Sequence, residues 1–565
     1  MNLMNTIYCY LCRTTQKSNR KLLYLIVITL ILSGCFLRSW RIGEMNIFAD
    51  EIHTLGCAIS KDFSWILTHF TASDSCIPLT FYNKLLLKAE LLNEYSMRLP
   101  SLISGCLLVA LMGTSLYILS PLETILTMGI ISFSPYFIYL SREARPYSVI
   151  SFTFTLSVIL IFLWAKGKDK RYLFFSAFLC SLSLYFQPVV APAIALLVLY
   201  PLFIIYYKKF SKNKLNEYIF FVLIFTGCSL VFLGPALPSF IQEFGNKGSR
   251  GQANFETIQN GMMLLLGLPI IIPLWAWGTA IVIGTISLYR RYPAEILCIA
   301  SIFTIQILAL FLIQPVGMEI PWVWFRYLAH LHSFLIIFIA CGIAYIFKYL
   351  ITEYSKLYIY LISVGACIFF FVWHITCNSY SINKFDSYNK HPIILFMEKD
   401  FYNSDLHELI SPFYYKTLKD LPEGDLIEAP MLIIFPLYEI YQHLHGRKFY
   451  SGTLGNGMWQ SIFDNQTNNN LKTIVPLNKF YPSNNASARY LIIHKRIKEE
   501  IKNMFKILKQ NPFMWTQIEK IDYMFTDDTL DKIFGSGELS IQNMKWVPNN
   551  IIYEDRFIAV YELSL

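Results

Sequence analysis

Long apolar runs separated by short polar stretches dominate the first two thirds of the chain. A run of about 20 apolar residues is long enough to cross a bilayer as a helix. Eleven runs are predicted membrane spans, near residues 22–37, 98–119, 122–141, 146–165, 171–187, 188–206, 217–236, 263–289, 294–314, 326–348 and 356–377. The stretch 263–289 is over-long and contains two prolines, which favours an interfacial helix followed by a span.

Composition agrees with a polytopic α-helical membrane protein. Of the 565 residues, 55% are hydrophobic and 15% are charged, whereas soluble domains carry about 25% charged residues. The net charge of +9 does not indicate a nucleic-acid partner, because the Lys and Arg residues fall largely in short loops between apolar runs. Residues 1–377 are therefore predicted to form one membrane domain.

Basic loops alternate along this domain and predict its orientation. The basic N-terminus and the stretches 166–171, 208–214 and 290–291 are placed in the cytoplasm by the positive-inside rule. The first outer loop, 38–97, and the turn 142–147 then face outward. Only the connection at 120–121 lacks Lys or Arg, so the count is weakest there. Arg38 and Trp40, which end the first span, are interpreted as anchors at the outer interface.

A different composition begins after Cys377, where polar and apolar residues mix. Three stretches are predicted to be strands, at 425–435, 488–494 and 557–561, and residues 495–508 have the periodicity of a helix. We expect residues 378–565 to form a soluble α/β domain. The odd number of spans places it outside the cytoplasm of a multi-pass cell-membrane protein.

All twelve cysteines lie at or before Cys377, and most are inside apolar runs. Cys9 and Cys12 form a Cys-x-x-Cys sequence without a second pair, so a zinc site is not indicated. Cys57 and Cys76 share the first outer loop, and the sequence leaves a disulfide between them open.

An acidic pair, Asp50-Glu51, follows the first span inside an otherwise apolar stretch. Charges at a membrane boundary are costly unless they are paired or used. Asp50 has the chemistry of a general base for a hydroxyl or amine acceptor. Glu51 is a candidate for support of that base or for metal binding, and His53 for assistance. The alternative is that both carboxylates are simply solvated in the loop and have no function.

The turn Ser141-Arg-Glu-Ala-Arg-Pro-Tyr147 lies on the same predicted side of the membrane. Arg142 and Arg145 could each hold a phosphate through two parallel hydrogen bonds, which Lys cannot do. Glu143 could hold one of these arginines in place, and Tyr147 begins the next span. The alternative is that both arginines simply contact lipid headgroups.

Two more outer positions carry candidate substrate-binding residues. Arg98 begins the second span, and Arg326 with Tyr327 begins the tenth, after a Trp-rich stretch. Both arginines are also explained as ordinary membrane anchors beside an aromatic belt.

These motifs, Ala49-Asp-Glu51, Met97-Arg-Leu-Pro-Ser101, Ser141–Tyr147 and Arg326-Tyr327, together resemble the membrane glycosyltransferases of the C superfamily. That group includes the protein O-mannosyltransferases and the bacterial aminoarabinose transferase of lipid A. The resemblance implies that Asp50 is the base and that the outer arginines hold the phosphate of the donor. One departure is Gln187-Pro188, where relatives often have a His after the fifth span.

The resulting expectation is an inverting glycosyltransferase that takes a sugar from a polyprenyl-phosphate donor. Its acceptor is a glycan, a lipid or a protein, and membrane lipids surround it. No cofactor is required by the sequence, and a role for a divalent cation stays open. A lipid or glycolipid transporter is the alternative function, and a membrane scaffold is a third.

Overall fold

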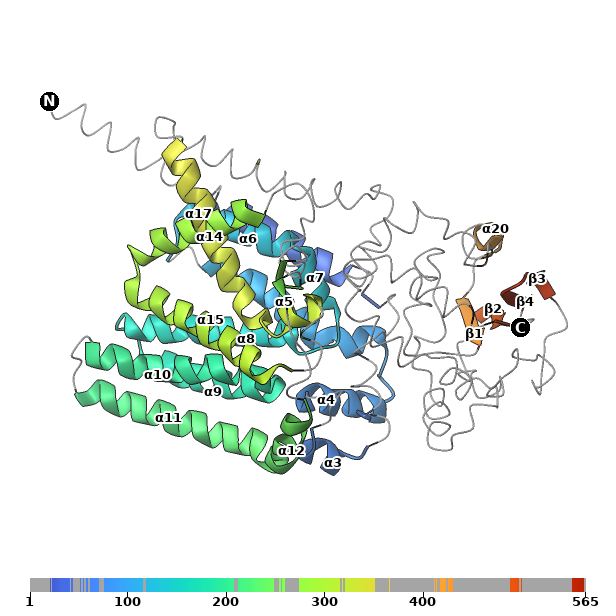
Figure 1. Ribbon diagram of the computed structural model, residues 1–565, viewed down its shortest axis with the longest axis horizontal. Coiled ribbons are helices and arrows are strands. Elements are labelled where there is room, and N and C mark those ends of the chain that lie inside the picture. Colours follow the sequence, from blue (N-terminus) through green and yellow to red (C-terminus); the bar gives the residue numbers. More distant parts are fainter. Residues whose placement is uncertain are drawn as a thin grey trace.

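The computed structural model describes residues 23–40, 61–70, 76–114, 118–207, 212–247, 274–315, 321–350, 418–422, 425–429, 488–496 and 551–562, with some single positions such as Glu51 and Thr54. Most of these residues are helical. Figure 1 shows the helices gathered in one bundle, with the strands at the right of the view.

The helices of the bundle follow one another through short connections. They are the helix Leu23–Ser39, α3 (Phe63–Thr68), α4 (Ile77–Lys88), α5 (Glu94–Gly113), α6 (Pro121–Phe133), α7 (Pro135–Arg142), α8 (Tyr147–Ala165), α9 (Lys170–Phe186), α10 (Ala191–Tyr207), α11 (Lys212–Leu233), α12 (Leu237–Lys247), α14 (Leu274–Tyr289), α15 (Pro293–Ile313), α16 (Pro321–Arg326) and α17 (His332–Leu350). Short 3₁₀ turns precede α10 (η2, Pro188–Val190), α12 (η3, Gly234–Ala236) and α17 (η4, Ala329–Leu331).

Six helices in the described part of the chain are long and apolar enough to cross a membrane, or seven if a bent pair counts as one span. The helix Leu23–Ser39 and α14 are shorter apolar helices. A multi-span helical architecture is therefore confirmed. The full number of eleven stays a prediction, because residues 260–273 and 356–377 lie almost entirely outside the described ranges.

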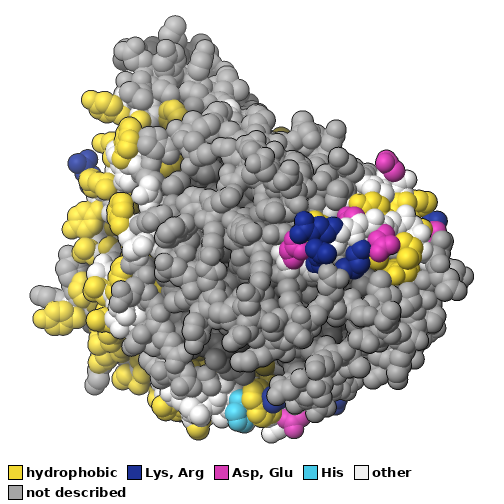
Figure 2. All heavy atoms as spheres, turned by 45° about the vertical axis from the view of Figure 1, so that its right-hand side comes forward, with side chains coloured by type: hydrophobic (Ala, Val, Ile, Leu, Met, Phe, Trp, Pro, Cys, Tyr) yellow, Lys and Arg dark blue, Asp and Glu magenta, His cyan; other side chains and the backbone are white. Residues whose placement is uncertain are grey.

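Burial separates the inner helices from the outer ones. The spanning window of α8 is 78% buried, whereas that of the helix Asn213–Gln242, which contains α11, is only 11% buried. Exposed apolar side chains collect along one edge of the molecule in Figure 2, and charged ones on the right. An apolar helix surface of this size needs lipid around it, so the protein is a membrane protein.

Small hydroxyl side chains join α8 to its neighbours inside the bundle. Thr153 hydrogen-bonds to Ser183 of α9 at 2.7 Å, and Thr155 to Ser333 of α17 at 2.8 Å. Ser148 donates to the backbone oxygen of Ser101 in α5 at 2.9 Å. Such interhelical bonds need no charge and let helices pack closely in lipid. They fix the position of α8, which begins at the turn after α7.

The predicted span 122–141 is broken in the structure. Helices α6 and α7 meet at an angle of 53°, with Pro135 as the first residue of α7 and Ser134 as its N-cap. Proline cannot donate a hydrogen bond to the preceding turn, so it ends α6 and suits the start of α7.

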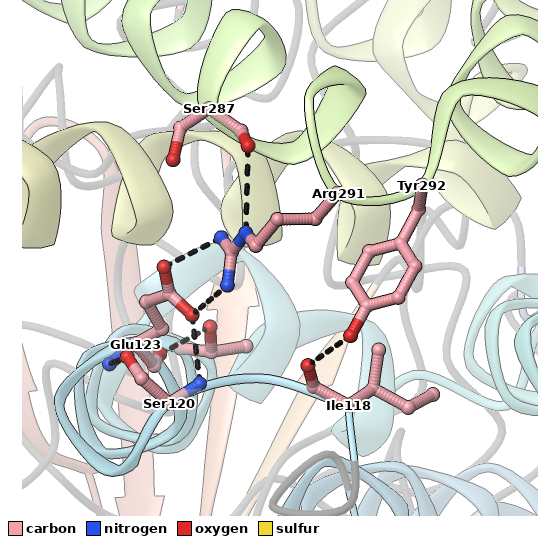
Figure 3. Close-up of polar contacts among 7 residues, drawn as sticks. Ile118, Ser120, Glu123, Ser287, Arg291 and Tyr292 are labelled. Carbon is pink, nitrogen blue, oxygen red and sulfur yellow. Dashed lines mark hydrogen bonds and ion pairs between the residues drawn. The ribbon is translucent and has the colours of Figure 1, made fainter.

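An ion pair ties the first turn of α6 to the loop between α14 and α15 (Figure 3). Arg291 donates from Nη2 to Oε1 of Glu123 at 2.6 Å and from Nη1 to Oε2 at 3.0 Å. The hydroxyl of Tyr292 donates to the backbone oxygen of Ile118 at 2.9 Å. Partial burial lowers the pKa of Arg291, but the bonds and charge of Glu123 raise it to a greater extent.

This pair bears on orientation, because segments in direct contact lie at the same membrane boundary. The connection at 120–121, which lacks Lys and Arg, meets the basic loop 290–291. The ammonium of Lys166 lies 4.2 Å from the ring centre of Tyr292. Three connections predicted to be cytoplasmic therefore lie together.

The described strands form one sheet in the order β1-β2-β4-β3. Strands β1 (Asp425–Ala429) and β2 (Ala488–His494) are parallel, whereas β4 (Ile558–Glu562) is antiparallel to both β2 and β3 (Ile551–Glu554). The strands expected within 425–435, 488–494 and 557–561 are confirmed, and β3 is an addition. Most of the helix predicted at 495–508 lies outside the described residues, and the extent of the domain, 378–565, stays a prediction.

The first outer loop contains two short helices, α3 and α4. Ser239 in the first turn of α12 exchanges hydrogen bonds with the backbone of Phe70, at 2.9 and 3.1 Å.

Glycine allows α14 and α17 to approach at backbone distance. A Cβ atom on Gly284 would lie 1.8 Å from the backbone oxygen of Phe338. We expect Gly284→Leu to separate the helices and lower the thermal unfolding temperature, since overpacking costs about 1–3 kcal/mol or more. Gly278→Leu on the same helix is the control, because no atom lies within 4 Å of its Cβ position. Equal melting temperatures for the two variants in detergent would contradict this packing.

Candidate functional site

Glu51 attaches the first outer loop to the bundle. Its carboxylate accepts two hydrogen bonds from Arg98 of α5, from Nε at 2.9 Å and from Nη2 at 2.7 Å. It also accepts one from the backbone nitrogen of Ala144, at 2.6 Å. Arg98 in turn donates to the backbone oxygen of Ile42 at 2.9 Å. One carboxylate thus connects the loop, the start of α5 and the turn before α8.

Two other arginines each cap the C-terminal end of a neighbouring helix. Arg38, from the helix Leu23–Ser39, donates to the backbone oxygens of Ile131 at 2.8 Å and Ser132 at 3.1 Å, near the C-terminal end of α6. Arg142, at the end of α7, donates to the backbone oxygens of Leu37 and Trp40, at 3.1 and 2.5 Å. Cations are favourable at helix C-termini, where carbonyl groups lack intrahelical partners.

The interpretation of Arg38 as an interface anchor is therefore wrong, because its side chain is fully buried in protein. Its Nε also donates to the hydroxyl of Ser141 at 3.2 Å. Ser141 fits there because Gly105 faces it, and a Cβ atom on Gly105 would lie 2.0 Å from that hydroxyl oxygen. Nothing in the sequence distinguishes a lipid-facing arginine at a span end from one that faces a broken helix.

Arg145 points from the turn between α7 and α8 toward the first outer loop. Its Nη1 donates to the hydroxyl of Thr54 at 3.3 Å, three residues after Glu51. The hydroxyl of Ser101 donates to its backbone oxygen at 2.8 Å and holds the turn against α5. The side chain of Arg145 is buried, and hydrogen bonds on both sides fix its position.

Arg326 joins this cluster from the far end of the membrane domain. At the end of α16, its guanidinium lies 5.1 Å from the ring centre of Tyr147, the first residue of α8. The hydroxyl of Tyr136 in α7 is close enough to Arg326, Tyr147 and Glu143 to interact with them electrostatically. Tyr327 follows Arg326 and is half-buried.

The structure therefore brings most of the described candidates together. Glu51, Arg98, Arg142, Glu143, Arg145, Tyr147 and Arg326 are all buried around the turn between α7 and α8. Asp50 and His53 lie outside the described residues, although their sequence neighbours Glu51 and Thr54 are described. Their roles stay predictions.

Sequence reasoning did not include four residues at this site: Arg38, Thr54, Tyr136 and His332. The ring of His332 packs against Tyr136 with 4.8 Å between ring centres. Arg38 ends an apolar run, whereas Tyr136 and His332 lie inside the predicted spans 122–141 and 326–348 and Thr54 lies in the first outer loop, so these residues share no sequence signal. Within the described ranges, no three His, Cys, Asp or Glu side chains are grouped so that they could hold a metal ion.

Comparison of the sequence with protein-family models and with curated proteins finds no match. Comparison with solved structures finds similarity over nearly the whole chain. ArnT from Cupriavidus metallidurans bound to undecaprenyl phosphate is 10% identical, with a TM-score of 0.42, and covers 95% of this chain and 97% of that one. Its apo state gives a TM-score of 0.44 at 9% identity, with the same coverage.

The oligosaccharyltransferase of Archaeoglobus fulgidus, in a complex with zinc and sulfate, is 12% identical, with a TM-score of 0.40. The match covers 88% of this chain and 70% of that one. TM-scores below 0.5 at such low identity establish no correspondence of individual residues.

We expect Glu51→Gln to destabilise the protein strongly. Glutamine keeps the size of the side chain but leaves the buried guanidinium of Arg98 without its charge partner, which costs about 3–5 kcal/mol. Thermal unfolding in detergent measures the loss. Glu90→Gln is the matched control, because Glu90 is exposed in the same loop. A melting temperature like that of the control would show that the ion pair contributes little.

Proposed function

We propose that this protein is a glycosyltransferase of the cell membrane that moves a sugar from a polyprenyl-phosphate donor to an acceptor at the outer face. One observation carries the proposal. The carboxylate of Glu51 holds an acidic loop segment against a turn that supplies Arg145, and Arg326 lies on the same cluster. A base and cations for a phosphate are thereby available at one membrane boundary.

In this mechanism Asp50 is the general base. It takes the proton from the acceptor hydroxyl or amine, whose oxygen or nitrogen attacks the anomeric carbon of the sugar from the face opposite the phosphate. The bond between that carbon and the phosphate oxygen breaks, and the configuration inverts. Because consecutive Cα atoms are about 3.8 Å apart, the attachment of Glu51 restricts where Asp50 can lie.

Arg145 and Arg326 stabilise the negative charge that develops on the leaving lipid phosphate. Preorganised cations in a site that excludes water are among the strongest contributors to catalysis. Glu143 and Tyr147 are proposed to position these two guanidiniums, and Tyr327 is a further candidate for substrate binding. His53 stays a candidate for assistance to Asp50. Glu51 and Arg98 act as the support beneath it, and Arg142 contributes mainly by capping the helix Leu23–Ser39.

The orientation follows from the two groups of loops. The stretches 118–123, 166–168 and 290–292 lie together, and the last two carry basic residues, so we assign all three to the cytoplasm. The cluster around Glu51 then faces outward, and so do the first outer loop, 38–97, and the domain 378–565. The acceptor, a glycan, lipid or protein, would approach from that side.

A transporter of lipids or glycolipids is the second candidate, because α6 and α7 form a broken span. Transporters use the carbonyl groups at such breaks to coordinate ions. Here the oxygens of Ile131 and Ser132 accept hydrogen bonds from Arg38. Since the protein itself satisfies these groups, the broken span favours a structural role over an ion site.

We expect Asp50→Asn to abolish transfer of the sugar and to leave folding intact. The change removes the basic carboxylate at nearly constant size, and loss of a general base lowers turnover by about 10²- to 10⁴-fold. Turnover with a polyprenyl-phosphate sugar measures the effect, and thermal unfolding checks the fold. Asp62→Asn is the control, since Asp62 caps α3 through its side chain and asparagine caps equally well. Normal turnover in Asp50→Asn would remove Asp50 as the base.

We expect Arg145→Lys and Arg145→Ala both to weaken use of the donor, with the alanine variant worse. A lost charge-assisted contact costs about 1.5–3 kcal/mol, which is roughly ten- to a hundredfold in rate or affinity. Arg142→Lys is the matched comparison and should lower thermal stability more than donor use. Wild-type donor dependence in both Arg145 variants would assign Arg145 to a purely structural role in holding the first outer loop.

A further inference from the structure

Two cysteines face each other between the helix Leu23–Ser39 and α5. Cys35 and Cys106 are close enough for a hydrogen bond between their thiols, and both side chains are half-buried. The guanidinium of Arg38, one turn along from Cys35, lies near enough to interact with both sulfur atoms. The proposed mechanism uses neither cysteine.

The packing of the two helices places this pair in a consistent antiparallel register. A Cβ atom on Gly34 would lie 3.2 Å from the side chain of Val109, and one on Gly113 would lie 3.3 Å from Val27. In this register, Cys35 lies beside Cys106 toward the predicted outer end of the two helices. Glycines at the contacts let the two backbones approach closely, as a disulfide between helices requires.

We propose that Cys35 and Cys106 are a disulfide-forming pair whose oxidation links the first helix to α5. The thiolate of one cysteine attacks the S–S bond of a disulfide oxidant and forms a mixed disulfide. The second thiolate then displaces the remaining thiol of the oxidant. The pair loses two electrons and two protons in total, and the oxidant is reduced to two thiols.

The cross-link would close the chain segment 36–105, which contains the whole first outer loop with Asp50, Glu51 and Arg98. A covalent bond at the base of this segment limits how far its two ends can separate. It therefore reinforces the same connection that the ion pair between Glu51 and Arg98 makes. This inference does not depend on the proposed function.

Peptide analysis of the full-length protein tests the pair. The purified protein in detergent is treated with diamide, alkylated, and digested with trypsin without reduction. Trypsin releases residues 22–38 and 99–142, each with a single cysteine. We expect most of these two peptides to appear joined by a disulfide after oxidation and to separate on reduction. Two separately alkylated peptides after diamide treatment would overturn the proposal.

Serine variants show whether the link is specific and what it does. Cys35→Ser and Cys106→Ser should each abolish the joined peptide, whereas Cys228→Ser on α11 should leave it unchanged. Oxidised wild-type protein should be cut by an added protease in the first outer loop at least several-fold more slowly than the reduced protein. That protection should be absent in Cys35→Ser. Equal protection in the variant would contradict closure of the loop by this pair.

Discussion

The ion pair between Glu51 and Arg98 is the interaction on which the rest of the site depends. Removing a carboxylate and a guanidinium from water costs several kcal/mol for each ion, and only close pairing with further hydrogen bonds offsets it. Both conditions are met, because two bonds join the ions and Ala144 and Ile42 supply the remaining partners. The loop must therefore lie on the bundle for these charges to be buried at all.

A buried guanidinium needs polar partners, and the buried arginines differ in the kind of partner that they contact. Arg38 and Arg142 face carbonyl oxygens at helix ends, which neither water nor lipid can reach in the interior of the bundle. Such arginines are held by several backbone acceptors, so they stabilise one arrangement of helices. Arg145 donates to the hydroxyl of Thr54, and the guanidinium of Arg326 lies 5.1 Å from the ring centre of Tyr147. Both side chains lie on the cluster around Glu51, and for that reason we propose them as the ligands of the donor phosphate.

The sequence predicted the features that follow from local pattern. Long apolar runs located most helices, and short apolar runs located β1, β2 and β4. It could not predict the partner of Glu51, because Arg98 is 47 positions away and no charge pattern connects them. The break between α6 and α7 was hidden inside one apolar run, since Pro135 is equally compatible with a kinked span. Strand β3 was missed because Ile551–Glu554 is short and polar at one end.

Helix α5 connects the two charged boundaries of the membrane domain. Its 20 residues span about 30 Å, close to the thickness of the hydrocarbon core. Arg98, near the first turn of α5, is held by the buried carboxylate of Glu51. The next helix, α6, is held near its own first turn by the ion pair between Glu123 and Arg291. The two ion pairs thus fix α5 at its start and α6 at its start, and α5 cannot shift along its axis without breaking the buried pair of Arg98. In the proposed mechanism this matters because the cations must be in position before the charge on the phosphate develops.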